Sequence, residues 1–579
     1  MSGPAGAVFN SAGQISTEYV PGAYSRIDTV LGSSGFSSFQ NCVIMGQGYG
    51  PKPQTLIQFN TIPQALATLY GGPLLDAVRL AFSPGNGITP QQLYIMVVNS
   101  STNATSYLTA STNNIIELST VAYGVQANQV THLLSAGTTT GKKLVITYKT
   151  QTETYDNLDQ QLMTIECTDG AATAATVTIV NTTATQTLTT SITGGTTAAL
   201  NINLANYLTI GDLVAYINNQ TGYAATVGAG YTNTAVTELD QVSALSILGS
   251  ATTLHGIEYA IINAVNQGSQ IVTAADVSGT AGVQPPSNDT ATVYFSGGSN
   301  GTYQATDWTN ALTALEAENV QLVTTPDPTL SVMSAISDHC TFMSSTDQRK
   351  ERQFVVGGAW GDPTTTAITN SQSLNNYLGM YVFNGGYQFN SSGVLTQYGA
   401  SYAACMLAAM KSGVSINVPL TRKTLNFVSL EQKLNQTDLV TLIQGAVAPV
   451  SYNVNGVANM VRQVTTYQAP NLIYNEFSMV TEANFISYDL RNYLDPLFIG
   501  NPTIKTMLGT LKGAVQSRLN SYVSDLGIIT TDANGRTWWN LTVTVSGDIA
   551  TVDFDANLTA PLNFVFATGH LHTSTSGVA

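Results

Sequence analysis

Two short groups of residues near the end of the chain have the types and spacing of metal ligands. His570 and His572 lie two residues apart, so both imidazoles could face one side of a strand. Asp553, Asp555 and Asn557 match the first half of a calcium-binding loop. The glycine and the distal glutamate of such a loop are absent, and two histidines near a terminus make a poor site. The sequence therefore predicts no metal site.

Glycine-rich turns follow two predicted strands and could approach a nucleotide phosphate. The run 45–50 contains three glycines, but it lacks the dinucleotide spacing, and Pro51 and Pro53 follow where a helix would have to begin. The run 297–302 lacks the lysine of a phosphate-binding loop. The chain also has no HExxH motif and no Cys/His nucleophile arrangement. We therefore predict no cofactor, no catalytic residue and no enzyme.

The remaining reactive side chains also favour structural roles. Cys42, Cys167, Cys340 and Cys405 lie far apart, without the paired spacing of a zinc site, and are expected to be buried thiols. The N-terminus has neither the basic nor the apolar region of a secretory signal, so we expect a reducing compartment. The run 347–352 is the densest charge cluster, and such runs are typical of solvated loops or helix ends.

Charged residues are unusually scarce in this chain. They make up 9% of its 579 residues, against about a quarter in ordinary soluble proteins. Asp and Glu number 34 and Lys and Arg 19, which gives a net charge of −15 and argues against a basic nucleic-acid groove. No segment approaches the ~20 uninterrupted apolar residues of a membrane span. Charge is depleted where surfaces are buried against partners, so the composition suggests subunits packed on several sides.

The elements that must carry any function alternate between strands and helices over two stretches. In the first, strands are predicted at 41–46, 55–59 and 92–99, with helices at about 61–71 and 73–82 between them. In the second, helices are predicted at 306–319, 328–343, 399–413 and 437–447, and strands at 291–301, 320–327, 353–360 and 457–468. This pattern indicates an α/β layer in both stretches.

Between about 100 and 290 the composition shifts toward Thr, Ala, Asn and Gly. Strands are predicted at 142–149, 175–181 and 188–195, and a helix at 209–222. This block therefore has the pattern of an inserted β-rich domain or pair of domains.

The last hundred residues carry the clearest helical pattern. A stripe that includes Leu511, Val515 and Leu519 predicts a helix at 503–526. Two alternating strands at 538–545 and 549–557 follow, and a further alternating segment occupies 562–568.

Several of these segments together resemble the tail sheath proteins of contractile phages and related contractile injection machines. Pro21-Gly22-Ala23-Tyr24 is similar to the family's Pro-Gly-Val-Tyr motif, and residues 41–99 resemble its first core unit. SGGSNG at 296–301, the following helix and the PDP turn resemble the second core unit. VRQVTTY at 461–467 and the final helix and strands resemble the C-terminal domain. The block between 100 and 291 has no such counterpart.

The resemblance implies a structural protein with a sheath-type α/β (α+β) multi-domain fold, a β-rich insertion, and extended N- and C-terminal arms. Sheath subunits form stacked hexameric rings around an inner tail tube. Baseplate and tail terminator proteins bind the two ends of this assembly. The sheath contracts to drive the tube through the host envelope. This implies a virion component assembled in the host cytoplasm, with no direct nucleic-acid contact and no membrane insertion. The domain boundaries we expect are 1–25 (N-terminal arm), 26–100 (first part of the core), 101–290 (surface-exposed insertion), 291–470 (second part of the core), 471–560 (C-terminal domain) and 561–579 (C-terminal arm).

Two sets of residues are candidates for contacts between subunits. The segment before Pro21 has too few large apolar residues for a core, and 562–568 alternates like a half-buried edge strand, so both termini are expected to join a neighbour's sheet. The candidate arm contacts are Val8, Phe9, Ile15, Tyr19, Leu562, Phe564 and Phe566. Because the resemblance places a helix of the C-terminal domain against the tube, Lys505 and Lys512 are candidate tube-facing residues.

Two other functions remain open from the sequence alone. One is another self-assembling phage structural protein, such as a capsid or baseplate component. The other is a secreted adhesive or polysaccharide-active protein, which the Thr/Asn-rich block suggests and the missing signal sequence disfavours.

Overall fold

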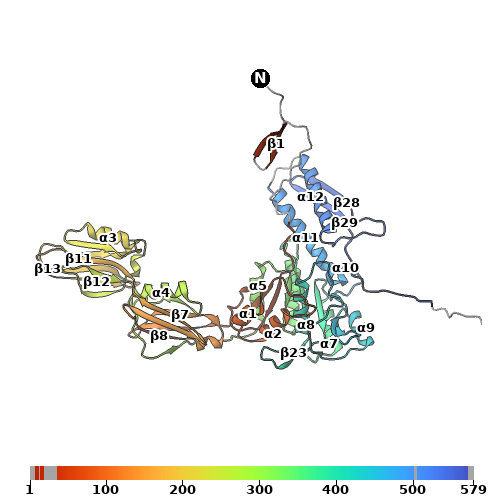
Figure 1. Ribbon diagram of the computed structural model, residues 1–579, viewed down its shortest axis with the longest axis horizontal. Helices are drawn as coiled ribbons and strands as arrows, with labels where there is room; N and C mark the ends of the chain where they lie inside the picture. Colours follow the sequence, from red (N-terminus) through yellow and green to blue (C-terminus); the bar gives the residue numbers. More distant parts are fainter. Residues whose placement is uncertain (1–6, 12–13, 19–34, 501–504, 571–579) are drawn as a thin grey trace, which may run out of the picture.

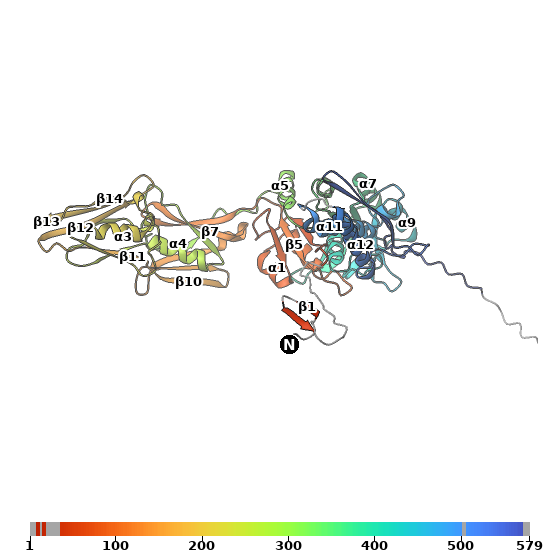
Figure 2. The ribbon, with the colours of Figure 1, turned by 90° about the horizontal axis from the view of Figure 1, so that it is seen from above.

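The computed structural model describes residues 7–11, 14–18, 35–500 and 505–570. An α/β core lies at the centre, and an elongated β-rich insertion projects from one side of it (Figure 1). A helical C-terminal domain projects from the core in a different direction. Seen from above, the insertion continues the long axis of the molecule away from the core (Figure 2).

The core is built on one eight-stranded sheet. Its six inner strands are parallel, and an antiparallel strand closes each edge. In spatial order the strands are β27 (Ala458–Met460), β26 (Ala448–Tyr452), β22 (Gly379–Phe383), β21 (Gln353–Gly357), β20 (Leu322–Thr324), β3 (Cys42–Gly46), β5 (Leu93–Val97) and β4 (Leu56–Phe59).

Helices cover both faces of this sheet, as parallel sheets require. Along β3, Cys42 and Ile44 point to one hydrophobic core, whereas Val43 and Met45 point to the other. The first face is covered by α1 (Ile62–Thr68), α2 (Pro73–Ala81) and α8 (Ala400–Ser412). The second face is covered by α5 (Ala305–Glu316), α6 (Leu330–Met343), α7 (Thr364–Leu374) and α9 (Gln436–Gln444). A small sheet of β24 (Leu395–Tyr398), β23 (Gly386–Phe389) and β25 (Ser429–Leu430) completes the core.

The insertion leaves the core after β5 and returns before α5 through two adjacent, antiparallel segments. Thr102 and Ser299 exchange two backbone hydrogen bonds of 2.8 and 3.3 Å there. Ser299 lies in a Gly-x-Ser-x-Gly sequence, but its hydroxyl accepts the amide of Gly301 at 3.1 Å as part of this junction. The insertion is thus tied to the core by this two-stranded base and by a second contact, in which Gly50 of the core and Tyr123 of the insertion exchange backbone hydrogen bonds of 3.0 and 2.7 Å.

Two lobes with separate hydrophobic cores make up the insertion. The proximal lobe contains β6 (Asn103–Ala110), β7 (Asn113–Tyr123), η1 (Val125–Gln129), β8 (Thr131–Ala136), β9 (Lys142–Tyr148), β10 (Gln151–Leu158), α4 (Ile257–Gly268), β18 (Val272–Asp276) and β19 (Val293–Tyr294). The distal lobe contains β11 (Gln161–Cys167), β12 (Ala172–Asn181), β13 (Gln186–Gly194), β14 (Asn201–Asn203), η2 (Leu204–Asn206), α3 (Ile210–Asn218), β15 (Tyr223–Val227), η3 (Val236–Glu238), β16 (Val242–Ser246) and β17 (Thr252–His255). Since the chain enters the distal lobe from β10 and returns at α4, the distal lobe is itself inserted into the proximal one.

The C-terminal domain combines two long helices with a hairpin. After the short α10 (Leu472–Asn475), α11 (Phe477–Phe498) runs from the core into this domain (Figure 1). There it packs with α12 (Lys505–Ser524), and α12 covers the hairpin of β28 (Trp538–Ser546) and β29 (Ile549–Ala556).

Most predicted elements are confirmed, and four differ. The predicted strand at 291–301 is a strand only at β19, which pairs with β8 in the proximal lobe of the insertion. The chain at 457–468 is a strand only at β27, and Arg462 and Gln463 follow in an irregular segment. Residues 562–568 do not form a strand, because no edge pairs with them within the described part of the chain. The N-terminal segment, expected to have no regular structure, forms a hairpin of β1 (Ala7–Ser11) and β2 (Gln14–Glu18).

The run 347–352 is a further correction. Glu351 and Arg352 are buried rather than solvated, because each finds partners that satisfy its charge. By contrast, the prediction that all four cysteines are buried free thiols is confirmed.

Candidate intersubunit surfaces

The C-terminal domain is held by the apolar stripe of α12 that the sequence predicted. Leu511, Val515, Leu519 and Tyr522 are buried against α11 and the hairpin. Two aromatic residues that precede β3, Phe36 and Phe39, complete this core through ring contacts with α11 and α12, and both were missed by sequence analysis.

A buried ion pair fixes the two helices of this domain in register. The Arg518 guanidinium donates to both carboxylate oxygens of Asp489 at 2.7 Å, and the Tyr522 hydroxyl and the Ser37 amide also donate to it at 2.7 Å. Burial alone would raise the pKa of Asp489, but these hydrogen bonds hold it below its ordinary value. A bidentate pair of this kind gives geometric specificity as well as energy.

The hairpin β28–β29 leaves both of its outer edges without a strand partner among the described residues. The side chains of β29 alternate between exposed and half-buried positions. Unpaired backbone groups at such an edge form a template for a strand from another chain.

The C-terminal segment that follows the hairpin has large apolar side chains in solvent. Leu558 bridges Ile529, and after that point the chain runs past α10 and away from the core (Figure 1). Leu562, Phe564 and Phe566 are 82%, 64% and 93% exposed. These candidate contact residues are therefore not covered by their own chain.

One contact ties this segment to the core. The Asn563 amide donates to Glu476 at 2.9 Å, and the Arg462 guanidinium, which also donates to Glu476, lies over the ring of Phe564. Glu476 is fully buried, so the charged pair anchors the start of the exposed segment.

The N-terminal hairpin stands clear of the core sheet in both views (Figures 1 and 2). In its register Val8 faces Thr17, Phe9 faces Ser16 and Ile15 faces Asn10. Tyr19 lies outside the described residues.

The candidate tube-facing lysines both belong to α12. Lys505 is its first residue, and Lys512 is exposed on the side of the helix away from the buried stripe. The exposed face around Lys512 consists of small or uncharged residues, among them Gly509, Gly513 and Gln516.

The motifs that suggested metal or nucleotide chemistry occupy ordinary structural positions. Asp553 and Asp555 lie on β29, and no cluster of three or more His, Cys, Asp or Glu side chains in the described part of the chain has the arrangement of a metal site. His572 lies outside the described residues. Within the same ranges, no helix combines the length and the apolar character of a membrane span.

Comparison with known proteins decides between the functions left open by the sequence. Residues 301–466 match the model of the phage tail sheath protein central domain. The tail sheath protein of Bacillus phage SP01 is 25% identical over 575 residues, which covers 95% of each chain. The chain is therefore similar to phage tail sheath proteins over nearly its whole length.

Other sheath proteins extend this similarity over most of the chain. The tail sheath protein of Staphylococcus phage Twort is 24% identical over 86% of this chain and 89% of its own. Two solved sheath tail proteins share the fold of this chain. The one from Listeria innocua has a TM-score of 0.55 at 10% identity, covering 90% of this chain and 92% of its own. The one from Desulfitobacterium hafniense has a TM-score of 0.51 at 11% identity, covering 90% and 93%.

Proposed function

We propose that this chain is the repeating structural subunit of a contractile phage tail sheath, which polymerises as stacked hexameric rings around the tail tube. The similarity of nearly the whole chain to phage tail sheath proteins supports this proposal. The observation that carries it is that the same chain has both a hairpin with unpaired edges, β28–β29, and a C-terminal segment with exposed apolar side chains.

Strand addition between subunits explains both features. An arm from a neighbour can pair with the open edge through backbone hydrogen bonds, while alternate side chains enter the sheet. We assign the arm contacts to Val8, Phe9, Ile15 and Tyr19 at the N-terminus. At the C-terminus we assign them to Leu562, Phe564 and Phe566.

Contraction needs links that persist while the subunits change their relative positions. Arms joined through backbone hydrogen bonds can remain paired while rigid core domains rotate, because the chain between arm and core absorbs the motion. The free energy for contraction is then stored in subunit packing at assembly, so the chain acts without a catalytic site or a cofactor.

The same assignment defines the other partners. The tail tube protein lies inside the sheath, and baseplate and terminator proteins bound it at its two ends. The subunit is a virion component that assembles in the host cytoplasm, with no direct contact to nucleic acid and no insertion into a membrane.

Truncation of the N-terminal arm tests this proposal. Removal of residues 1–20 should give soluble, folded subunits that do not form long sheaths, because the strand donor is lost. Negative-stain microscopy measures sheath length, and circular dichroism checks the fold. Long sheaths of normal appearance from the truncated protein would contradict the proposal.

A variant at the other terminus provides an independent measurement. Changing Leu562, Phe564 and Phe566 together to Ser should shorten the sheaths, because the apolar contacts of the arm are removed while the subunit core is untouched. The matched control is Val454→Ser, since Val454 is a fully exposed apolar residue in the turn between β26 and β27 and is expected to be neutral.

A further inference from the structure

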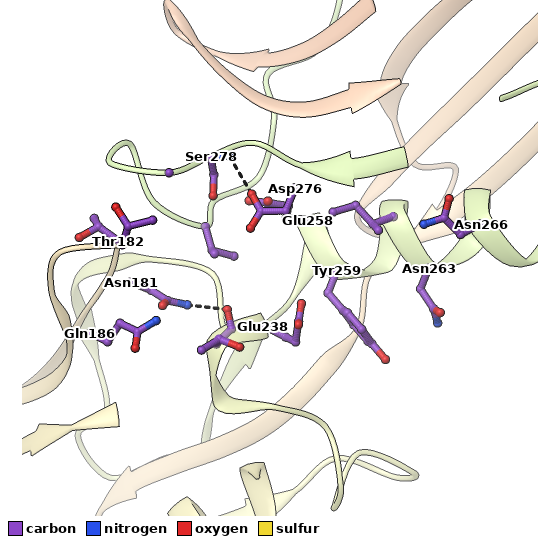
Figure 3. Close-up of a pocket in the computed structure, with 15 residues that line it drawn as sticks. Asn181, Thr182, Gln186, Glu238, Glu258, Tyr259, Asn263, Asn266, Asp276 and Ser278 are labelled. Carbon is purple, nitrogen blue, oxygen red and sulfur yellow. Dashed lines mark hydrogen bonds between the residues drawn. The ribbon is translucent and has the colours of Figure 1, made fainter. Parts of the chain in front are cut away.

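A polar pocket of about 330 Å³ opens between the two lobes of the insertion (Figure 3). Thr182, Gln186 and Glu238 line it from the distal lobe, and Tyr259 and Asn263 line it from one face of α4. Its volume lies within the ~300–1,000 Å³ of small-ligand pockets, which occur preferentially at domain interfaces.

Hydrogen-bonding groups in this pocket remain unused. Within the described part of the chain, the Gln186 amide, the Glu238 carboxyl and the Tyr259 hydroxyl make no hydrogen bond to protein. Asn263 accepts one hydrogen bond from Gln267 at 2.8 Å, which leaves its own NH₂ group free to donate. Both lobes therefore offer donors and acceptors to the same space.

The buried carboxyl at the back of the pocket, Glu258, does not add a negative charge to it. Glu258 accepts the amide of Gln284 at 2.9 Å. Burial raises the pKa of Glu258 to about 9, and the hydrogen bond and charge of Asp276 act in the same direction. Glu258 is thus protonated at neutral pH, and Asp276 accepts the Ser278 amide at 2.7 Å.

The lining of the pocket argues against an anion and against a metal ion. No lysine or arginine lines the pocket, so an anion has no counter-charge there. The described carboxyls do not have the arrangement of a metal site, which argues against a coordinated cation.

We propose that this pocket binds a neutral saccharide. Sugar hydroxyls both donate and accept hydrogen bonds, and the pocket offers both kinds of partner: the Gln186 amide can donate and accept, the Glu238 carboxyl can accept, and the Asn263 NH₂ group can donate. The Tyr259 ring supplies an apolar face for the C–H side of a pyranose, with its hydroxyl at the polar end. The inference concerns the insertion alone and does not rest on sheath assembly, although repetition along a polymer would multiply a weak affinity.

Titration of the full chain with neutral disaccharides tests the proposal. Maltose, cellobiose and chitobiose are the probes, with saturation-transfer NMR at millimolar concentrations as the measurement. We expect at least one to bind, and Gln186→Ala and Asn263→Ala each to weaken binding about tenfold, as loss of one hydrogen bond predicts.

The two substitutions lie in different lobes, so local unfolding of one lobe cannot explain both effects. Gln151→Ala and Tyr294→Ala are matched controls on exposed positions of the same insertion, outside the pocket, and should leave affinity unchanged. Binding of none of the three sugars, binding unchanged in the pocket variants, or a response to calcium chloride alone would each overturn the proposal.

Discussion

At the scale of single residues, Arg352 shows how this weakly charged chain uses its few charges. The side chain is fully buried and donates to the carbonyl oxygens of Leu315 and Glu318 at 2.9 and 2.7 Å, just where α5 ends. The last carbonyls of a helix have no partner within the helix, so a buried cation there supplies both hydrogen bonds and charge complementarity. His339 contacts the same guanidinium at 2.5 Å and must therefore stay neutral.

This arrangement predicts acid sensitivity of the core. Burial and the Arg352 charge lower the pKa of His339 to about 3. Between pH ~3 and ~6.5, His339 is protonated in the unfolded chain but neutral in the folded one. The free energy of unfolding is therefore highest above pH ~6.5 and decreases as the pH falls toward 3. The loss due to His339 should reach about 3 kcal/mol by pH ~4. Urea unfolding of wild type and His339→Gln, each at neutral and acid pH, measures it.

The variant keeps an acceptor for Arg352 but does not titrate, so its stability should fall less on acidification than that of the wild type. His570→Gln, at an exposed position, is the control and should behave as wild type. An identical pH dependence in all three proteins would show that His339 does not titrate on unfolding.

Apart from the aromatic residues Phe36 and Phe39, the residues that sequence analysis missed are polar or charged but buried. Arg352 and Glu351 belong to the densest charge run of the chain, which normally indicates a solvated surface. Their burial depends on partners distant in sequence, such as Leu315 and Arg491, and spacing along the chain carries no signal of those contacts.

At the scale of elements, a helix could be predicted where apolar residues recur at helical spacing without interruption. The helix α12 was predicted because its buried residues recur with helical spacing on an otherwise polar chain. In contrast, α11 was missed because Ser478, Thr481, Glu482 and Asp489 are buried along it, which disrupts the apolar stripe. The segment 562–568 has the alternation of a strand, but it pairs with no strand within the described part of the chain and is therefore irregular.

The exposed side of α12 leads to a prediction about the tube. If this face lies against the tube, replacing Lys505 and Lys512 together by Glu should weaken tube-templated sheath assembly, with a larger effect at low salt, because exposed charges are screened within a Debye length of ~10 Å at 0.1 M salt. Sedimentation of sheath with purified tube over a salt series measures the effect. Lys433→Glu, an exposed lysine of the core, is the control. Unchanged co-sedimentation of the double variant would remove these lysines from the tube contact.

At the scale of the whole molecule, the insertion and the rest of the chain are separately folded parts. The core sheet and the C-terminal domain carry the segments on which the predicted resemblance rested, but the alignment with the tail sheath protein of Bacillus phage SP01 covers 95% of this chain and so includes the insertion. The prediction that residues 101–290 have no counterpart in sheath proteins is therefore wrong. The two lobes of the insertion have hydrophobic cores of their own. A domain with its own core can be removed without exposing the core of its host, provided that the chain ends at the junction lie close together.

Deletion of the insertion should therefore leave assembly intact. Thr102 and Ser299 form a hydrogen-bonded antiparallel pair, so replacing residues 103–298 by Asn-Gly closes a two-residue hairpin of the favoured type. We expect a folded subunit that still forms sheaths of normal length, with a smaller outer diameter in electron micrographs, since the insertion is proposed to lie on the outer surface. Tyr70 is half-buried and packs against Tyr148 of the insertion, so the deletion would expose its ring. It should be changed to Ser in the deletion variant to avoid a new apolar patch. Tyr70→Ser in the full-length chain is the control for that change. A deleted subunit that folds but forms no sheath would place the insertion between subunits instead of outside them.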